Sequence, residues 1–169
     1  MTLIGIISVI VLVLIVFQFK SMSTVELNHK IEINAPKEKV WQILNQLEAV
    51  SDYNPQVDQA KCISEMRTGV GASRECTMKD GSSVKERVVF IESNTISMEL
   101  YESSWPVKEM RWTTKLSDLS GRTEMTQKLE YKVKFGAIGA LLNTFVMKSK
   151  MYAAIQETFE GLKKHAEKD

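Results

Sequence analysis

The chain has 169 residues, of which 44% are hydrophobic and 25% are charged, so it is long enough for one globular domain with an added segment. Its formal net charge is +1 and no basic run contains interleaved aromatic residues, which argues against a nucleic-acid partner. The only cysteines, Cys62 and Cys76, lack C-x-x-C spacing and a histidine cluster, so we expect neither a metal site nor a cofactor. Reduced thiols are favoured over a disulfide, although the two predicted strands that carry them are neighbours.

The amino-terminal segment is strongly apolar. No charged side chain occurs before Lys20, and residues 3–17 are almost wholly Ile, Leu and Val. A helix of this length reaches nearly the ~30 Å of a bilayer's hydrocarbon core, which predicts a transmembrane anchor over residues 1–20. A cleaved secretory signal is the alternative, but no basic residue precedes the apolar run. Because Lys20 and Lys30 follow the run, we expect a single-pass membrane protein whose domain lies in the cytoplasm.

After a polar linker at residues 21–24, a strand leads directly into a helix. Apolar and polar residues alternate from Val25 to Ile33, the period of a strand with one covered face. Pro36 lacks a backbone donor and suits the first position of a helix, so the strand ends and the helix begins there. Apolar residues continue at helical spacing to Leu47, and turn residues end the element near Pro55.

Consecutive strands follow, and we place one domain over residues 25–169. Turn signals such as Asp80-Gly81 and Ser120-Gly121 separate the strands, so neighbours should pair antiparallel. The later strands alternate apolar and polar residues, which indicates one covered face and one wet face. The strands are predicted near residues 56–65, 71–79, 83–92, 95–103, 108–118 and 121–135.

A long helix is predicted from about Ala137 to Ala166, because apolar residues recur there at steps of three and four. Its apolar stripe should cover the sheet. The predicted fold class is therefore α+β, with a curved antiparallel sheet of about seven strands wrapped around a long carboxyl-terminal helix.

Three stretches carry a resemblance to a known superfamily: IEINAPKEKVWQIL, GVGASRECTMKDGSSVKERV and GALLNTFVMKSKMYAAIQETFEGLKKHAE. With the strands between them they cover residues 25–167 and resemble the SRPBCC superfamily, in particular its polyketide cyclase/dehydrase and lipid-transport branch, which is related to START domains. The resemblance implies a helix-grip fold that encloses a cavity for apolar ligands. Some members cyclise polyketides and others carry lipids, sterols or quinones, and similarity of fold does not choose between these activities.

The inward-facing positions of the predicted sheet and helix are mostly apolar. Such a set is typical both of a solid core and of a cavity, because methionine fills gaps in cores and also adapts to apolar ligands. The resemblance favours a cavity. The ligand-binding residues predicted on this basis are Arg74, Cys76, Glu86, Val88, Met98, Leu100, Met110, Trp112, Gln127, Leu129, Met147 and Met151.

Arg74 and Glu86 are the most specific feature of this set. A three-residue loop at residues 80–82 would place Cys76 opposite Glu86 and leave Arg74 diagonal to Glu86 on the covered face. Buried charges are costly unless they are paired, so an ion pair is expected. The pair either supports the scaffold or lets Arg74 orient a carbonyl, phenolate or carboxylate of a ligand.

No residue is predicted as catalytic with any specificity. The candidates are Arg74, Glu86, His29 and Tyr131, but the sequence places no serine, cysteine or carboxylate beside His29. A lone histidine on a covered face is more often a core residue. Trp105-Pro106 predicts a rigid aromatic loop, either at a corner of the sheet or at the mouth of the cavity.

The sequence thus predicts a membrane-anchored binding or carrier protein for an apolar small molecule, such as a lipid, an isoprenoid or a quinone-like compound. The alternative is a polyketide cyclase or dehydratase that uses the same cavity, which would need titratable groups within hydrogen-bond reach. A protein-binding module on the outer sheet face ranks last, because that face is a solvated mixture of Lys, Glu and Thr.

Overall fold

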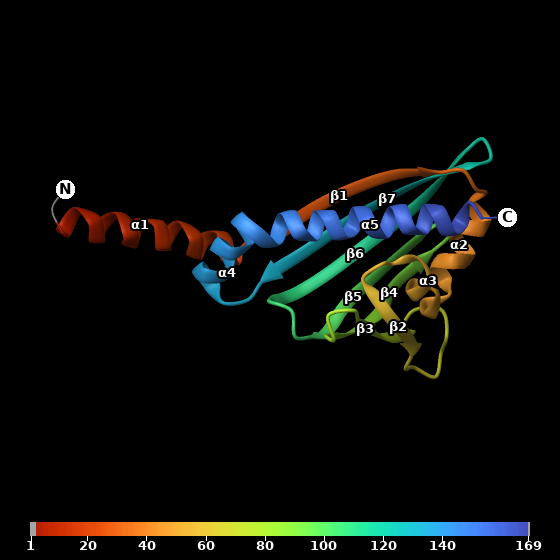
Figure 1. Ribbon diagram of the computed structural model, residues 1–169, viewed down its shortest axis with the longest axis horizontal. Coiled ribbons are helices and arrows are strands. Elements are labelled where there is room, and N and C mark those ends of the chain that lie inside the picture. Colours follow the sequence, from red (N-terminus) through yellow and green to blue (C-terminus); the bar gives the residue numbers. More distant parts are fainter. Residues whose placement is uncertain (1–2, 169) are drawn as a thin grey trace.

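The computed structural model describes residues 3–168, which form an amino-terminal helix, a seven-stranded sheet and a helical carboxyl-terminal segment (Figure 1). The helical elements are α1 (Leu3–Met22), α2 (Lys37–Asn45), the 3-10 helix η1 (Leu47–Ala49), α3 (Val50–Tyr53), α4 (Gly136–Leu142), the π-helical turn η2 (Asn143–Met147) and α5 (Lys148–Ala166). The strands are β1 (Val25–Ile33), β2 (Val57–Cys62), β3 (Ser73–Met78), β4 (Ser83–Glu92), β5 (Thr95–Ser103), β6 (Val107–Leu119) and β7 (Arg122–Val133).

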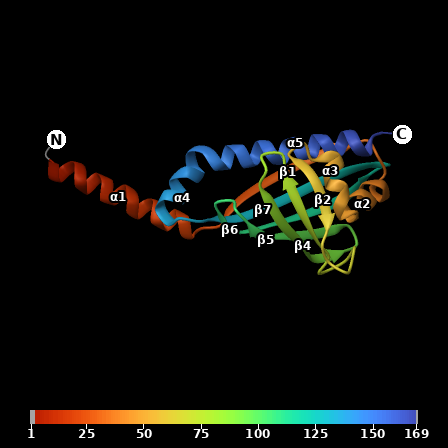
Figure 2. The ribbon, with the colours of Figure 1, turned by 60° about the horizontal axis from the view of Figure 1, so that its bottom comes forward.

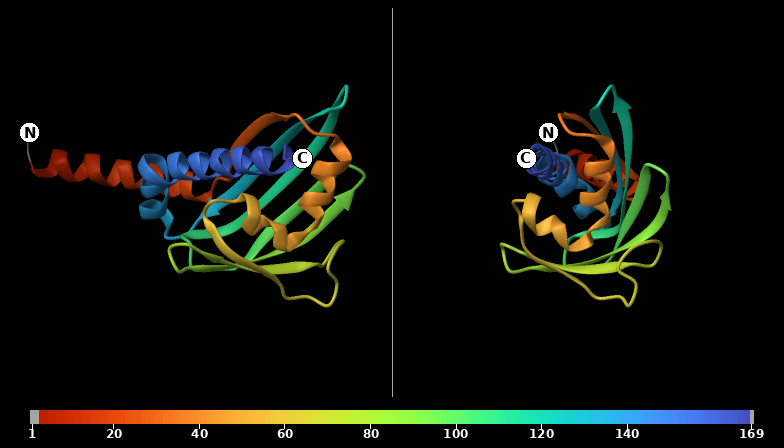
Figure 3. Two further views of the ribbon diagram at one scale, coloured as in Figure 1. Left: turned by 45° about the vertical axis from the view of Figure 1, so that its right-hand side comes forward. Right: turned by 90° about the vertical axis from the view of Figure 1, so that its right-hand side faces the viewer.

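The sheet is antiparallel throughout and has the strand order β1-β7-β6-β5-β4-β3-β2. It bends around α5, which lies in the hollow of the curve (Figures 2 and 3). Short hairpin connections join β3 through β7 in sequence, and β1 closes one edge by pairing with β7. The predicted α+β helix-grip architecture is confirmed.

The first helix of the domain is interrupted, although the sequence pattern predicts a continuous helix from Pro36 to Leu47. α2 begins after Pro36, whose φ of −58° and ψ of 144° are extended. It ends at Gln46, whose φ of −85° and ψ of 90° leave the helical region. The break turns η1 toward the sheet, where Leu47 packs in a buried cluster with Ala72 and Val88.

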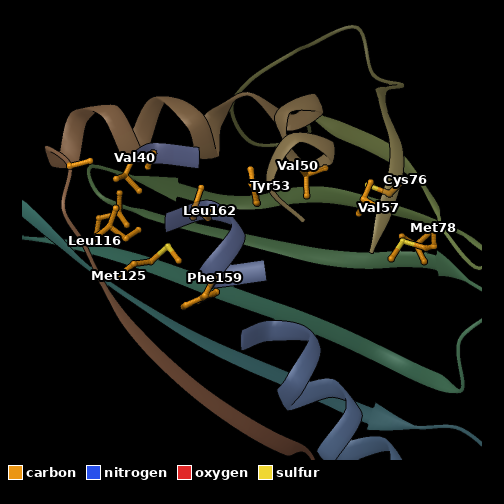
Figure 4. Packing of buried hydrophobic residues seen from close by; sticks show 14 residues of the cluster. Val40, Val50, Tyr53, Val57, Cys76, Met78, Leu116, Met125, Phe159 and Leu162 are labelled. Atoms are coloured by element: carbon orange, nitrogen blue, oxygen red, sulfur yellow. The ribbon is translucent and has the colours of Figure 1, made fainter. Parts of the chain in front are cut away.

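The main core lies between α5, the α2–α3 segment and the concave face of the sheet. Phe159 and Leu162 point from α5 toward the strands that carry Leu116 and Met125 (Figure 4). Further along the sheet, the same cluster includes the buried residues Val50, Tyr53, Val57, Cys76 and Met78. Several of the inward positions predicted from alternation therefore lie in this core.

The carboxyl-terminal helical segment bends at η2, whereas the apolar stripe predicts one unbroken helix from residue 137 to 166 (Figure 2). A π-helical turn inserts an extra residue into the hydrogen-bond ladder and changes the face that the following turns present. Here the buried hydroxyl of Tyr131 donates to Oδ1 of Asn143, also buried, at 2.6 Å. This contact fixes the π-helical turn to β7.

The amino-terminal helix α1 projects from the domain, and its side chains from Ile6 to Val16 are largely exposed (Figure 1). Its other end packs on the domain, because Phe17 contacts the cluster around Leu27, and Oε1 of Gln18 accepts a hydrogen bond from the backbone of Ala137 at 3.2 Å. The helix extends to Met22, which shortens the connection expected at residues 21–24.

Across residues 3–168, no helix has the length and apolar character needed to cross a membrane. The predicted transmembrane anchor and single-pass membrane location are therefore wrong. The described apolar run that stands free of the domain is too short, since a span needs about 20 residues and Phe17 and Gln18 of α1 already contact the domain. Residues 1–2 of the predicted anchor and residue 169 of the predicted domain lie outside the described residues.

Gly161→Ala should destabilise the protein, although glycine-to-alanine changes in helices usually stabilise. A Cβ at Gly161 would lie 1.9 Å from the carbonyl oxygen of Tyr53, so α5 would have to move away from α3. We expect the free energy of unfolding to fall by about 1–3 kcal/mol in urea titrations followed by circular dichroism. Ser149→Ala, at an exposed position of the same helix, is the control and should change it by less than ~0.5 kcal/mol. An unchanged midpoint for Gly161→Ala would contradict this close approach.

Candidate ligand-binding cavity

A cavity of about 160 Å³ lies between α5 and the concave face of the sheet. Its walls are mainly apolar, with Met110, Trp112 and Leu129 from the sheet facing Met151 and Ile155 from the helix. Apolar cavities of about 150 Å³ in proteins bind molecules the size of benzene. This space therefore suits a small ring or one part of a longer apolar ligand.

A buried ion pair forms one wall of the cavity. Nε of Arg74 donates to Oε2 of Glu86 at 2.7 Å, and the two side chains are only 8% and 12% exposed. The residues lie directly opposite each other on β3 and β4, whereas the predicted loop would have made them diagonal. The hairpin register is shifted by two residues, and a shift of two keeps every side chain on its predicted face.

Arg74 also fastens the sheet to the helical segment above it. Its Nη1 donates to the backbone carbonyl of Leu47 at 2.9 Å, which connects β3 to η1. Burial disfavours the charged form of the Arg74 guanidinium and so lowers its pKa. The nearby Glu86 carboxylate favours the charged form more strongly, so the pKa of Arg74 lies above its ordinary value. Arg74 is thus permanently charged and already bonded on two sides.

Tyr53 and Cys76 complete the polar cluster, which we define as Tyr53, Arg74, Cys76 and Glu86. Burial raises the pKa of the Tyr53 phenol, and the Arg74 guanidinium partly opposes this rise. Burial, and then the nearby Glu86 carboxylate, raise the pKa of the Cys76 thiol to about 12. Both groups are therefore neutral near pH 7, and the charges of Arg74 and Glu86 balance each other.

A second polar contact lies across the sheet from this cluster. Nε2 of Gln127 donates to Oγ1 of Thr114 at 3.0 Å, and both residues line the cavity from neighbouring strands. Each of the two side chains therefore has a hydrogen-bond partner within the protein.

An outer pocket of about 500 Å³ adjoins the cavity. It lies between the Trp105-Pro106 loop, the start of α5 and the loop after β3. Five residues line both the pocket and the cavity: Gln56, Met78, Trp105, Met151 and Ala154. The shared residues form the boundary between the two spaces. The predicted aromatic loop lies at this boundary, since Trp105 lines both spaces.

Nine of the twelve residues predicted to bind a ligand line the cavity: Arg74, Cys76, Glu86, Met98, Met110, Trp112, Gln127, Leu129 and Met151. Three do not. Val88 is buried with Leu47 and Ala72 beneath η1, Leu100 packs beside the core clusters, and Met147 lines the outer pocket.

The other two catalytic candidates lie apart from the polar cluster. The ring of His29 packs edge-on against Phe159 and Tyr152, with ring centroids 4.7 and 5.4 Å away. Burial lowers the pKa of His29, and the negative charge of Glu160 partly offsets this by raising it. The hydroxyl of Tyr131 is bonded to Asn143 in the π-helical turn. Neither residue lines the cavity.

The sequence did not identify the residues that the α3–β2 connection contributes. Tyr53, Asn54 and Gln56 line the cavity, although this stretch has the composition of a solvent-exposed turn. The available signal was the aromatic side chain of Tyr53 within an otherwise polar turn. Ala154 was also missed, because a small residue on a helix face gives no indication that space lies beside it.

Within residues 3–168, no group of His, Cys, Asp or Glu side chains is arranged to hold a metal ion, and Cys62 and Cys76 are free thiols. The cavity therefore offers packing surface, one ion pair and a few neutral polar groups for recognition. These features suit an apolar molecule with a small number of polar atoms.

Comparison with known proteins identifies the same architecture. The family described as polyketide cyclase / dehydrase and lipid transport matches residues 24–167. A protein from Thermus thermophilus superposes with a TM-score of 0.70 at 19% identity, covering 84% of this chain and 97% of that chain. A START superfamily protein from Mycobacterium smegmatis gives 0.68 at 15% identity, covering 84% and 97%. The Zhui aromatase/cyclase of a Streptomyces species gives 0.64 at 14% identity, covering 82% and 94%. No curated protein sequence matches the chain.

Arg74→Ala is expected to lower the free energy of unfolding by about 3–5 kcal/mol, because Glu86 would remain buried without a cation. Urea unfolding provides the measurement. The control is Arg122→Ala, which removes an ion pair with Glu32 whose side chains are 54% and 51% exposed, and it should cost less than ~1 kcal/mol. Equal losses for the two variants would mean that Glu86 is hydrated rather than buried.

Alkylation of the folded protein at pH 8 should modify Cys62 and spare Cys76. Cys76 is 1% exposed, and its raised pKa keeps the thiol protonated until the pH approaches about 12. Intact mass after iodoacetamide treatment should show one adduct in buffer and two in urea. The folded Cys62→Ser variant should show none, and an adduct there would contradict the burial of Cys76.

Proposed function

Because this chain belongs to the polyketide cyclase/dehydrase and lipid transport family, we propose that it binds an apolar small molecule of the lipid, isoprenoid or quinone-like class in the cavity between α5 and the sheet. The main support is the apolar cavity and the outer pocket that adjoins it. Removing apolar ligand surface from water contributes about 25 cal/mol per Å². The walls thus supply the affinity, and the few polar groups supply orientation.

The chemistry of the lining supports binding over reaction. Met98, Met110 and Met151 are flexible and polarizable, so they can repack around ligands of different shape. Arg74 and Glu86 are bonded to each other, and Arg74 is also bonded to Leu47. A general base needs a free lone pair within reach of a proton, and Oε2 of Glu86 already accepts a hydrogen bond from Arg74.

A cyclase or dehydratase acting in the same cavity is the second candidate. The position of the Tyr53 phenol beside the Arg74 guanidinium supports it, since a cation and a phenol together can polarise a carbonyl group. Recovery of bound molecules after incubation separates the two candidates. A ligand returned chemically unchanged supports the carrier, and a new product supports the enzyme.

The outer face of the sheet gives little support to a protein-binding role. It carries ion pairs such as Arg87 with Glu99, Lys128 with Glu26 and Lys132 with Glu109. Charged pairs that are exposed in this way are typical of a solvated surface. We therefore assign the function to the concave side.

Ala154→Phe should block the passage between the outer pocket and the cavity, because Ala154 lines both spaces. We expect the affinity for Nile red, a neutral apolar fluorophore, to fall at least about tenfold. The reason is that the dye would lose most of its apolar contact with the cavity walls. Ala153→Phe, on the exposed side of the same helix, should bind normally. Circular dichroism establishes that both variants are folded. Native mass spectrometry that finds no bound apolar molecule, together with unchanged dye uptake in Ala154→Phe, would refute the proposed function.

A further inference from the structure

We call the cavity and the adjoining outer pocket together the binding path. Its two ends differ in charge. The inner end is the polar cluster, where Arg74 and Glu86 neutralise each other. The outer end has two lysines in its lining, Lys79 and Lys150, and one carboxylate, that of Asp80. The path therefore runs from a balanced interior to a mouth with a net positive charge.

A charged head group has no favourable position at the inner end. Nε and Nη1 of Arg74 already donate to Glu86 and to the carbonyl of Leu47. A carboxylate brought to Arg74 would also approach Glu86, and the repulsion would offset the attraction in a medium of low dielectric constant. The inner end accepts a neutral apolar or hydrogen-bonding group instead.

The outer end of the path, which we call the mouth, can accept a negatively charged head group. Lys79 follows β3 and Lys150 lies near the start of α5, so two separate elements bring ammonium groups to the rim of one pocket. Both side chains are exposed, and neither forms an ion pair within residues 3–168. The Asp80 carboxylate is already engaged, since its Oδ1 accepts hydrogen bonds from the backbone and the hydroxyl of Ser82 at 2.9 and 2.6 Å.

The distance between the two ends fits an extended chain. Met78 lines both spaces, and Arg74 lies four residues earlier on the same face of β3, which is roughly 13 Å at the usual rise of a strand. The rim between the lysines is apolar, with Trp105, Pro106 and Met147. A chain can therefore pass from the rim into the cavity along apolar surface.

We propose that the ligand is an anionic amphiphile, whose negatively charged head lies between Lys79 and Lys150 and whose apolar chain extends toward the polar cluster. This inference rests on the proposed function and names the chemical class of its ligand. The lysines are exposed, so their contribution is screened by salt and is modest for each contact. They determine which amphiphile binds and in which direction, and the walls determine most of the affinity.

Decanoate and 1-decanol test this, because they share a ten-carbon chain and differ in the head group, which is an anionic carboxylate in one and a neutral hydroxyl in the other. Calorimetric titration of the native protein should show tighter binding of decanoate at 50 mM salt, and this advantage should shrink at 500 mM salt. In the double variant Lys79→Glu with Lys150→Glu, decanoate should bind about ten- to thirtyfold more weakly, while 1-decanol changes less than about twofold.

The control variant combines Lys115→Glu with Lys164→Glu, which makes the same change of net charge away from the mouth. It should leave the preference for decanoate intact. If the mouth variant and the control lose the same amount, or if decanoate and 1-decanol respond alike, the head is not recognised by the lysines and the inference fails, although the cavity still binds apolar chains. If neither compound nor Nile red binds the native protein, the proposed function fails and the inference fails with it.

Discussion

The contact between Arg74 and Glu86 joins the parts of the molecule that enclose the cavity. It pairs β3 with β4 on their concave face, and the second bond of Arg74 reaches the carbonyl of Leu47 in η1. A charged side chain thereby adds to the apolar packing of Leu47 and Val50 in holding the helical segment from α2 to α3 over the sheet. A buried pair of this kind adds little net stability, but it is costly to break, so it fixes geometry.

The position of α5 depends on its two ends. Near the carboxyl end, Gly161 allows the helix to approach the backbone of Tyr53, and Phe159 and Leu162 pack into the core. At the other end, the bond between Tyr131 and Asn143 holds the π-helical turn against β7. Between these anchors the helix presents Met151, Ala154 and Thr158 to the cavity. The contacts at the two ends thus set the position of the helix on both sides of the cavity.

Alternation in the sequence was sufficient to predict the inward face for most strand residues, and this is why most of the predicted binding residues line the cavity. Phe90 is an exception: alternation places it inward, but it is exposed, and the pairing of β4 with β5 is irregular beside it. The hairpin register was off by two residues, and the error did no harm because side chains alternate with a period of two. The break at Gln46 and the π-helical turn could not be predicted, since each depends on contacts with distant residues, such as that between Asn143 and Tyr131. For α1, apolar composition alone could not reveal that Phe17 and Gln18 pack on the domain.

The hydrogen bonds of the cavity explain how a ligand can be both held and released. Gln127 is bonded to Thr114, and Arg74 is bonded to Glu86, so the polar groups in the walls satisfy one another when no ligand is bound. Within residues 3–168, the one buried side-chain nitrogen or oxygen without a partner is Nδ1 of His29, which lies outside the cavity. Departure of an apolar ligand therefore breaks neither of these two contacts, and the free-energy difference between the loaded and empty states comes mainly from apolar contact. This balance suits a protein that exchanges its ligand, because the same polar contacts remain in the empty cavity.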